Sequence, residues 1–194
     1  MKFVVFISLL TLALLNFGCA SNPATQSVLL YQSINTDNVA VVSATALYKS
    51  GSINIADAKA VYVSGVATES ALRLWQVELN ANSSSAPQTA TLVAQDISTL
   101  LAQLQSMQTH LPASVKAKLT TYTLDAKTKA TISSSDIISI VELAIQLTPE
   151  ISDWAQSIFA TTTVTADQIT QAFTTLDASL ASLQSAIAPS AAIR

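Results

Sequence analysis

Few side chains in this sequence are of the types that carry out chemistry. His110 is the only histidine and Cys19 the only cysteine among 194 residues. A single imidazole excludes a metal site with several histidine ligands and any Ser-His-Asp triad built around a second histidine. His110 precedes Leu111 at the expected end of a helix, where an imidazole interacts with the last carbonyl groups more often than it acts as a general base.

The acidic residues offer no better candidate for catalysis. Glu142, Glu150 and Asp153 form the nearest cluster of carboxylates, and acid–base chemistry needs two such groups at short range. We expect these three around Pro149 on the outer faces of helices, where paired catalysis is not favoured. Gly51 and Gly65 lie too far apart for a phosphate-binding loop. The sequence therefore predicts no enzyme, no cofactor and no metal site.

The first residues have the pattern of an export signal. Lys2 is positively charged, residues 3–15 are apolar except for Ser8 and Thr11, and small residues follow. A membrane-spanning helix needs about 20 apolar residues, so this run is too short to remain as a span. We therefore expect a cleaved signal peptide that takes no part in the fold.

The sequence "LLNFGCASN" at 14–22 resembles the signal of bacterial lipoproteins. In that family, a leucine and two mostly small residues precede the cysteine that receives a lipid. Gly18 and Cys19 match the pattern, whereas the two residues before Gly18 do not. The resemblance implies that residues 1–18 are removed and that the Cys19 thiol carries a diacylglyceryl group. Because Ala20 rather than aspartate follows, it also implies sorting to the outer membrane, facing the periplasm.

Ordinary signal cleavage after Ala20 is the alternative, and it would remove Cys19 together with the signal. The absence of a second cysteine favours lipidation, because a free thiol is a liability in an oxidising compartment. Each buried methylene contributes roughly 0.8 kcal/mol, and lipoproteins of this type carry more than one acyl chain. The expected partner of the N-terminus is therefore a membrane.

The composition predicts a polar surface with little charge. Only 11% of the residues are charged and the net charge is −3, whereas about 25% is usual for soluble proteins. Alanine, serine, threonine and glutamine are expected to occupy the outer positions. No clustered basic face is present, so we expect no nucleic-acid partner.

Apolar residues recur at spacings of three and four through most of the chain after residue 26, which predicts helices. The first is expected over 27–49, ending before Gly51. The second begins after Asn54, an N-cap with Asp57 in the first turn, so that the two form an antiparallel hairpin. Their inward stripes are Leu30, Ile34, Val41 and Tyr48, and Ala58, Val61, Gly65, Leu72, Trp75 and Leu79.

The pattern continues beyond a loop at 82–88. Pro149 interrupts the fourth segment, either as a kink or as the start of a new helix after Thr148. Thr165 and Gln168 form a capping-box pair at the start of the last helix. The three stripes are Val93, Ile97, Leu100, Leu104, Met107 and Leu111; Ile137, Ile140, Ala144, Leu147, Ile151, Trp154 and Ile158; and Ile169, Phe173, Leu176, Leu180, Leu183 and Ile187.

Together these segments predict an all-α fold, an antiparallel bundle of about five helices. We expect a signal peptide at 1–18, a lipidated cysteine and tether at 19–26, a single helical-bundle domain at 27–188, and a C-terminal tail at 189–194. Trp75 and Trp154 both fall on inward stripes, which favours core packing over a ligand pocket.

Residues 112–133 contain four lysines that could contact anionic lipid headgroups. A solvated loop is the favoured interpretation of these lysines. The region itself is expected to form a short, poorly formed helix, because apolar residues fit one helical face although its threonines favour extended chain. The lysines are Lys116, Lys118, Lys127 and Lys129.

The hairpin sequence "AVVSATALYKSGSINIADAKAV" resembles small helical proteins of prophages and tailed phages of Gram-negative bacteria, over residues 27–80. Two function classes follow. The first is a non-catalytic, lipid-anchored envelope protein that acts as an interaction or scaffold module with a protein partner in the envelope. The alternative, which the phage resemblance implies, is a phage- or prophage-encoded envelope lipoprotein involved in superinfection exclusion or lysis.

Overall fold

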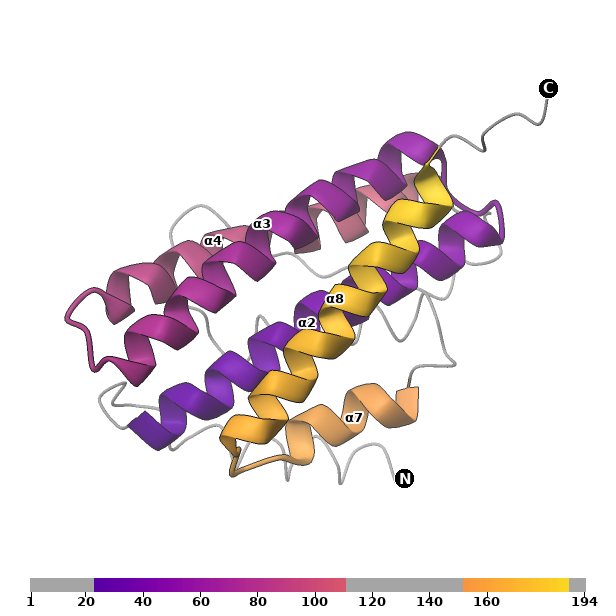
Figure 1. The fold of residues 1–194 in the computed structure, drawn as a ribbon. Helices are drawn as coiled ribbons and strands as arrows, with labels where there is room; N and C mark the ends of the chain where they lie inside the picture. The colour runs from indigo at the N-terminus through magenta and orange to yellow at the C-terminus, as the bar shows by residue number, and fades with distance from the viewer. Residues whose placement is uncertain (1–22, 111–151, 189–194) are drawn as a thin grey trace.

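The fold is known from a computed structural model, which describes residues 23–110 and 152–188. Within these residues all regular secondary structure is α-helical, which confirms the all-α bundle (Figure 1). Helix α3 is paired with α4, and α8 lies along α2 with the short α7 at one end (Figure 1). The helices are α2 (Pro23–Lys49), α3 (Ile55–Asn80), α4 (Ala86–His110), α7 (Ser152–Ala160) and α8 (Ala166–Ile187).

Helix α2 begins at Pro23, earlier than the expected start at residue 27. Residues 23–26, predicted as part of a tether, are therefore helical. Proline is well suited to the first position of a helix, because its fixed φ is helical and its missing N–H would have no partner there. The first half of the expected fourth segment, with Pro149, lies outside the described residues.

The turn between α2 and α3 has the geometry that the sequence predicts. Gly51 has a φ of 74°, in the left-handed region that glycine adopts without strain. The N–H of Ser52 donates to the carbonyl of Leu47 (2.8 Å), and the N–H of Gly51 donates to that of Tyr48 (3.0 Å). This pair of bonds is the Schellman motif, which ends α2 and lets α3 fold back along it.

Both expected N-caps are present. The Asn54 side chain accepts hydrogen bonds from the backbone N–H groups of Ala56 (2.7 Å) and Asp57 (3.0 Å). Thr165 accepts from the N–H of Gln168 at the start of α8, and the Gln168 side chain accepts from the N–H of Thr165. These bonds satisfy N–H groups that have no partner within the helix, which explains why the helices begin at these residues.

Replacing Asn54 by alanine is expected to lower the free energy of unfolding by about 1 kcal/mol, because it removes both bonds at the start of α3. Urea unfolding followed by circular dichroism measures the change. Asn80 is exposed at the other end of the same helix, so Asn80→Ala is the matched control. Equal midpoints for Asn54→Ala and wild type would show that the cap contributes nothing.

The predicted apolar stripes of α3, α4 and α8 form the core wherever their side chains are described. Leu72, Val93, Ile97, Leu100 and Leu176 are fully buried. The whole stripe of α8 is buried, as is that of α3 except for Leu79, which is partly buried. Helical periodicity thus identified the inward faces of these three helices correctly.

Helix α2 differs from the others because it is buried on almost every side. It packs against α3, α4, α7 and α8, and nearly all residues from 28 to 45 are buried. The general expectation from composition, that serine, threonine and glutamine occupy outer positions, therefore does not hold for α2. Gln32, Ser33 and Thr36 are buried with the apolar stripe, because a helix surrounded by others has no outer face.

Candidate functional site

The first candidate site is a run of buried polar side chains in the middle of α2, which we call the α2 polar segment (residues 32–38). Isolated polar groups are costly to bury, so a continuous run of them inside a helical bundle needs an explanation. Apart from Ile34, every side chain in the segment is polar and buried: Gln32, Ser33, Asn35, Thr36, Asp37 and Asn38.

Two members of the segment bond to their own helix. The Thr36 hydroxyl donates to the carbonyl of Gln32 (2.7 Å), and the Asn35 amide donates to that of Tyr31 (2.8 Å). Such bonds to a carbonyl one turn earlier satisfy a polar group without a tertiary partner. These residues are therefore compatible with a buried helix.

Three other members have polar atoms with no partner among the described residues. They are the Ser33 hydroxyl, both carboxyl oxygens of Asp37, and the amide oxygen and nitrogen of Asn38. Asp37 and Asn38 are fully buried. A buried carboxylate without a hydrogen-bond donor or a cation is among the most unfavourable groups in a protein core.

Gly65 brings α3 close to this carboxyl group. A Cβ atom on Gly65 would lie 3.2 Å from Oδ1 of Asp37, and 3.0 Å from both Val41 Cγ2 and Leu180 Cδ2. The glycine therefore lies where α2, α3 and α8 meet. A larger residue at position 65 would push these helices apart.

Burial raises the pKa of Asp37 well above its ordinary value, and the negative charges of Glu69 on α3 and Asp96 on α4 raise it further. Burial also raises the pKa of Asp96. Both ion pairs among the described residues are made by Arg73, and neither includes Asp37. The core therefore favours the neutral, protonated form of Asp37.

The chemistry open to this segment is limited. Among residues 23–110 and 152–188, no three metal-binding side chains come together. A neutral carboxylic acid in an apolar core can donate a hydrogen bond or lose its proton as the pH rises. The segment is therefore a titratable part of the core, and it couples the stability of the bundle to pH.

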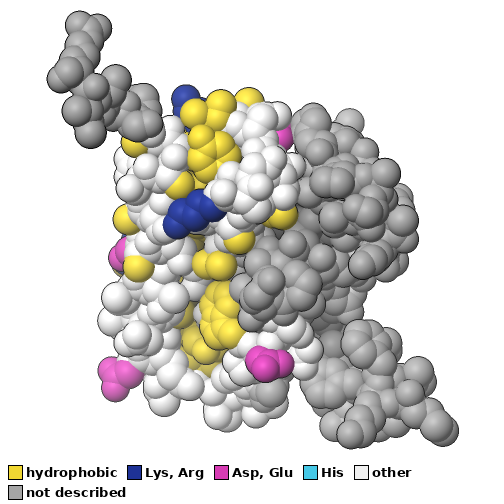
Figure 2. Space-filling view, turned by 90° about the vertical axis from the view of Figure 1, so that its right-hand side faces the viewer, with side chains coloured by type: hydrophobic (Ala, Val, Ile, Leu, Met, Phe, Trp, Pro, Cys, Tyr) yellow, Lys and Arg dark blue, Asp and Glu magenta, His cyan; other side chains and the backbone are white. Residues whose placement is uncertain are grey.

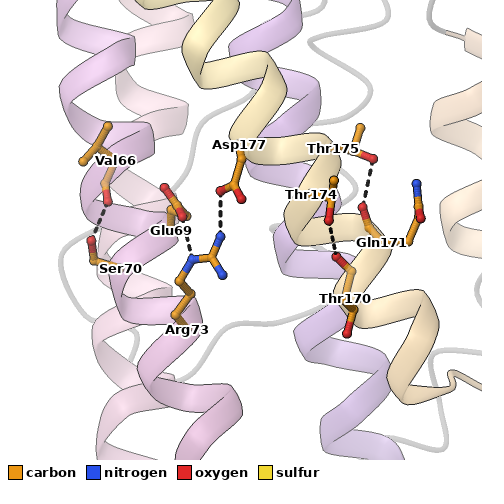
Figure 3. Close-up of polar contacts among 9 residues, drawn as sticks. All are labelled: Val66, Glu69, Ser70, Arg73, Thr170, Gln171, Thr174, Thr175 and Asp177. Carbon is orange, nitrogen blue, oxygen red and sulfur yellow. Dashed lines mark hydrogen bonds and ion pairs between the residues drawn. The ribbon is translucent and has the colours of Figure 1, made fainter.

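A surface network joins α3 to α8. Arg73 Nε donates to Glu69 and Arg73 Nη2 to Asp177, both at 2.6 Å, and the guanidinium lies 4.5 Å from the ring centre of Phe173 (Figure 3). Glu69 and Arg73 are four positions apart on one helix, whereas Asp177 is brought close to Arg73 by the packing of α8 against α3. Partial burial lowers the pKa of Arg73, but the hydrogen bonds to Glu69 and Asp177 and the negative charges of these two carboxylates together raise it above its ordinary value.

The second candidate site is a row of apolar side chains on the outside of α3. Five of the six large hydrophobic residues that are exposed in the described chain belong to this helix. In Figure 3, Val66 and Ser70 lie on the edge of α3 that points away from α8. We call the central part of this face the α3 outer stripe: Val63, Val66, Ser70, Leu74 and Val77.

Most of the site residues expected from the sequence cannot be compared with this geometry. Cys19 and the four lysines, Lys116, Lys118, Lys127 and Lys129, lie outside the described residues. So do Glu142 and Glu150, whereas Asp153 is exposed on α7. His110 is the last residue of α4, as expected for a helix end.

The two tryptophans differ in burial. Trp75 is buried in the core as predicted, although its indole N–H has no partner among the described residues. Trp154 is only partly buried, so its predicted place in the core is not confirmed. Among the described helices, α7 contacts mainly α2, and Ile158 is buried.

Sequence reasoning missed both candidate sites, although each left a signal. Asp37 is the only charged residue of α2 before Lys49, and so long a stretch with one charge indicates a helix buried on all sides. On α3, the row of valines and Leu74 follows a second helical stripe beside the buried one. A helix with two apolar faces contacts more than its own core.

The fold and these two features define a helical bundle with a titratable core and an outward apolar stripe. Comparison with family models, with curated proteins and with solved structures finds no match. Within the described segments, no helix is both long enough and apolar enough to cross a membrane.

Proposed function

We propose that this protein is a non-catalytic, lipid-anchored component of the cell envelope that acts as an interaction module. The lipid on Cys19 would hold the bundle at the membrane, most simply the outer membrane on its periplasmic side. The folded domain would offer its outer helix faces to a protein partner.

The observation that carries the interaction role is the α3 outer stripe. Val63 is 66% exposed and Val77 62% exposed, although both are large apolar side chains. Single exposed apolar residues are normal, whereas a row of them on one helix is typical of a binding surface. Its apolar members, Val63, Val66, Leu74 and Val77, lie on one face of α3, and helices are recognised by partners through such an apolar face.

The rest of the surface suits the same role. On the face shown in Figure 2, charged side chains are few and most of the described surface is polar but uncharged, with a broken band of hydrophobic side chains. Such a surface has little long-range electrostatic attraction, so binding depends on close contact between complementary faces.

The lipid anchor is tested by growing cells with radiolabelled palmitate. Wild-type protein is expected to carry the label and to sediment with membranes. Cys19→Ser removes the only thiol and should remove both properties, since the diacylglyceryl group is attached through that sulfur. An unlabelled wild-type protein would contradict the proposed anchor.

The interaction role is tested by placing a photo-crosslinking amino acid at Val77 in intact cells. The matched control carries it at Thr174, which is exposed on α8. We expect crosslinked products from position 77 and few from position 174, because only the first lies on the apolar stripe. Equal yields from the two positions would contradict the role of the stripe, and mass spectrometry of the products identifies the partner.

A further inference from the structure

The α2 polar segment is covered by α8 at the position of Asp37. A Cβ atom on Gly65 of α3 would lie 3.2 Å from Oδ1 of Asp37 and 3.0 Å from Cδ2 of Leu180. The carboxyl group of α2 and the leucine of α8 therefore meet at the same point of α3. Leu180 is itself buried, so the docking of α8 helps to keep water away from Asp37.

The charges around Asp37 disfavour its ionised form. The described charges that act on it are both acidic, Glu69 on α3 and Asp96 on α4, and burial together with these charges raises the pKa of Asp37. Arg73 is bonded to Glu69 and to α8 at the surface, and Lys59 is exposed. The acidic residues of α7 and α8 are exposed: Asp153, Asp167 and Asp177. No described side chain donates a hydrogen bond to Asp37, so its ionised form is stabilised by gaining contact with water.

Helix α8 has the simplest attachment of the helices that cover Asp37. It packs through one apolar stripe, and most residues on its other faces are exposed. Among the described residues, one side-chain hydrogen bond links it to another helix, the surface bond between Arg73 and Asp177. Figure 1 shows α8 beside α2, joined to α7 at one end. The joining residues 161–165 are not helical, so they can change direction without breaking a helix.

Helices α2, α3 and α4 are connected to one another more firmly. The turn at Gly51 joins α2 directly to the capped start of α3. Gln103 of α4 donates a partly buried hydrogen bond to the Ser64 hydroxyl of α3 (2.9 Å). Movement of α8 alone would expose Asp37 and leave these contacts intact. Such local opening costs less free energy than unfolding of the whole bundle.

We propose that α8 undocks from α2 and α3 when Asp37 is ionised, so that the bundle is closed at acidic pH and opens as the pH rises. The proton of Asp37 passes to solvent, and the carboxylate gains water. Opening exposes the apolar stripe of α8 and the side of α2 that it covers. This inference goes beyond the proposed function, because it depends neither on a lipid at Cys19 nor on the α3 outer stripe.

Hydrogen exchange of the full chain with Cys19→Ser, followed by mass spectrometry from pH 5 to pH 8, tests the opening. After correction for the intrinsic exchange rate, the opening constant of α8 should rise by up to about tenfold per pH unit, because opening releases one proton. Helices α3 and α4 should exchange at least about tenfold more slowly than α8 at pH 8. Uniform exchange over the three helices, or an α8 opening constant that does not change with pH, would overturn the proposal.

Two substitutions show whether Asp37 controls the opening. Asp37→Asn stays neutral, so its α8 opening constant at pH 8 should remain close to the value that wild type has at pH 5. Asp153→Asn, exposed on α7, should behave like wild type. If α8 opened equally at pH 8 with aspartate and with asparagine at position 37, the carboxyl group would not be the switch.

Thiol labelling at pH 8 gives an independent measurement in the same Cys19→Ser background. Ala172→Cys places a buried thiol on α8, and Ala94→Cys places one on α4. The thiol on α8 should react at least about tenfold faster than the thiol on α4, and adding Asp37→Asn should slow it by a similar factor. Equal rates at the two positions, or a rate at position 172 that Asp37→Asn does not change, would contradict undocking of α8.

Discussion

Replacing Asp37 by asparagine is expected to stabilise the protein by about 2–4 kcal/mol at pH 8, the range for relieving a buried charge that has no partner. Asp37 is fully buried and neither carboxyl oxygen has a hydrogen-bond partner among the described residues. Asparagine has nearly the same shape and no charge at any pH. The variant therefore removes the unfavourable ionisation and keeps the packing against Gly65.

The direction of the pH dependence follows from the raised pKa of Asp37. Unfolded chains release this proton near the ordinary pKa of 3.8, whereas the folded protein holds it to a higher pH. Between these two values the folded state binds more protons than the unfolded state, so stability falls as the pH rises. The slope for one group reaches about 1.4 kcal/mol per pH unit. The contribution of Asp37 to stability is most favourable below its ordinary pKa, where the carboxyl group is protonated in both the folded and the unfolded chain.

Chemical denaturation at a series of pH values measures this slope. Asp37→Asn should reduce it, leaving the smaller contribution of Asp96, whose pKa burial also raises. Asp153 is exposed on α7, so Asp153→Asn should leave the slope of the wild type nearly unchanged. A wild-type stability that stays constant or rises from pH 4 to pH 8 would contradict a neutral, buried Asp37.

Replacing Gly65 by valine is expected to destabilise the bundle by about 3 kcal/mol. Even a Cβ atom at this position would lie 3.0 Å from Val41 and Leu180, and the methyl groups of valine would extend further into α2 and α8. Three helices meet here, so the added atoms cannot move to solvent. Thermal unfolding of the variant should begin at a markedly lower temperature.

Two further variants separate packing from helix propensity. Ala67 is exposed on the same helix, so Ala67→Val measures the cost of a β-branched residue alone, under about 1 kcal/mol. Gly65→Ala should be nearly neutral, because about 1 kcal/mol of helix propensity offsets the tight contacts of one Cβ atom. If Gly65→Val were no worse than Ala67→Val, the close approach at Gly65 would be unimportant.

The sequence was sufficient for those parts of the fold that depend on neighbouring residues. The capping residues Asn54 and Thr165 start their helices because each side chain reaches N–H groups only two or three positions away. Gly51 ends α2 for an equally local reason. The buried stripe of α8 could be predicted from the spacing of its apolar residues, because every third or fourth residue lies on the same face of a helix.

The burial of α2 and the exposure of the α3 outer stripe depended on tertiary structure. Periodicity shows which residues share a face, but it does not show how many faces of a helix its neighbours cover. Thr36 is polar and still lies inside because α2 is surrounded by other helices. Val63 is apolar and lies outside because no described helix covers that side of α3.

The sequence by itself determined the helices, their ends and most of their inward faces, since these follow from hydrogen bonds and spacing within about one helical turn. Only the tertiary structure placed Asp37 beside Gly65 and linked Arg73 to Asp177, more than one hundred residues away. Burial and charge pairing between helices depend on which helices become neighbours, and that choice is made by the packing of the whole core.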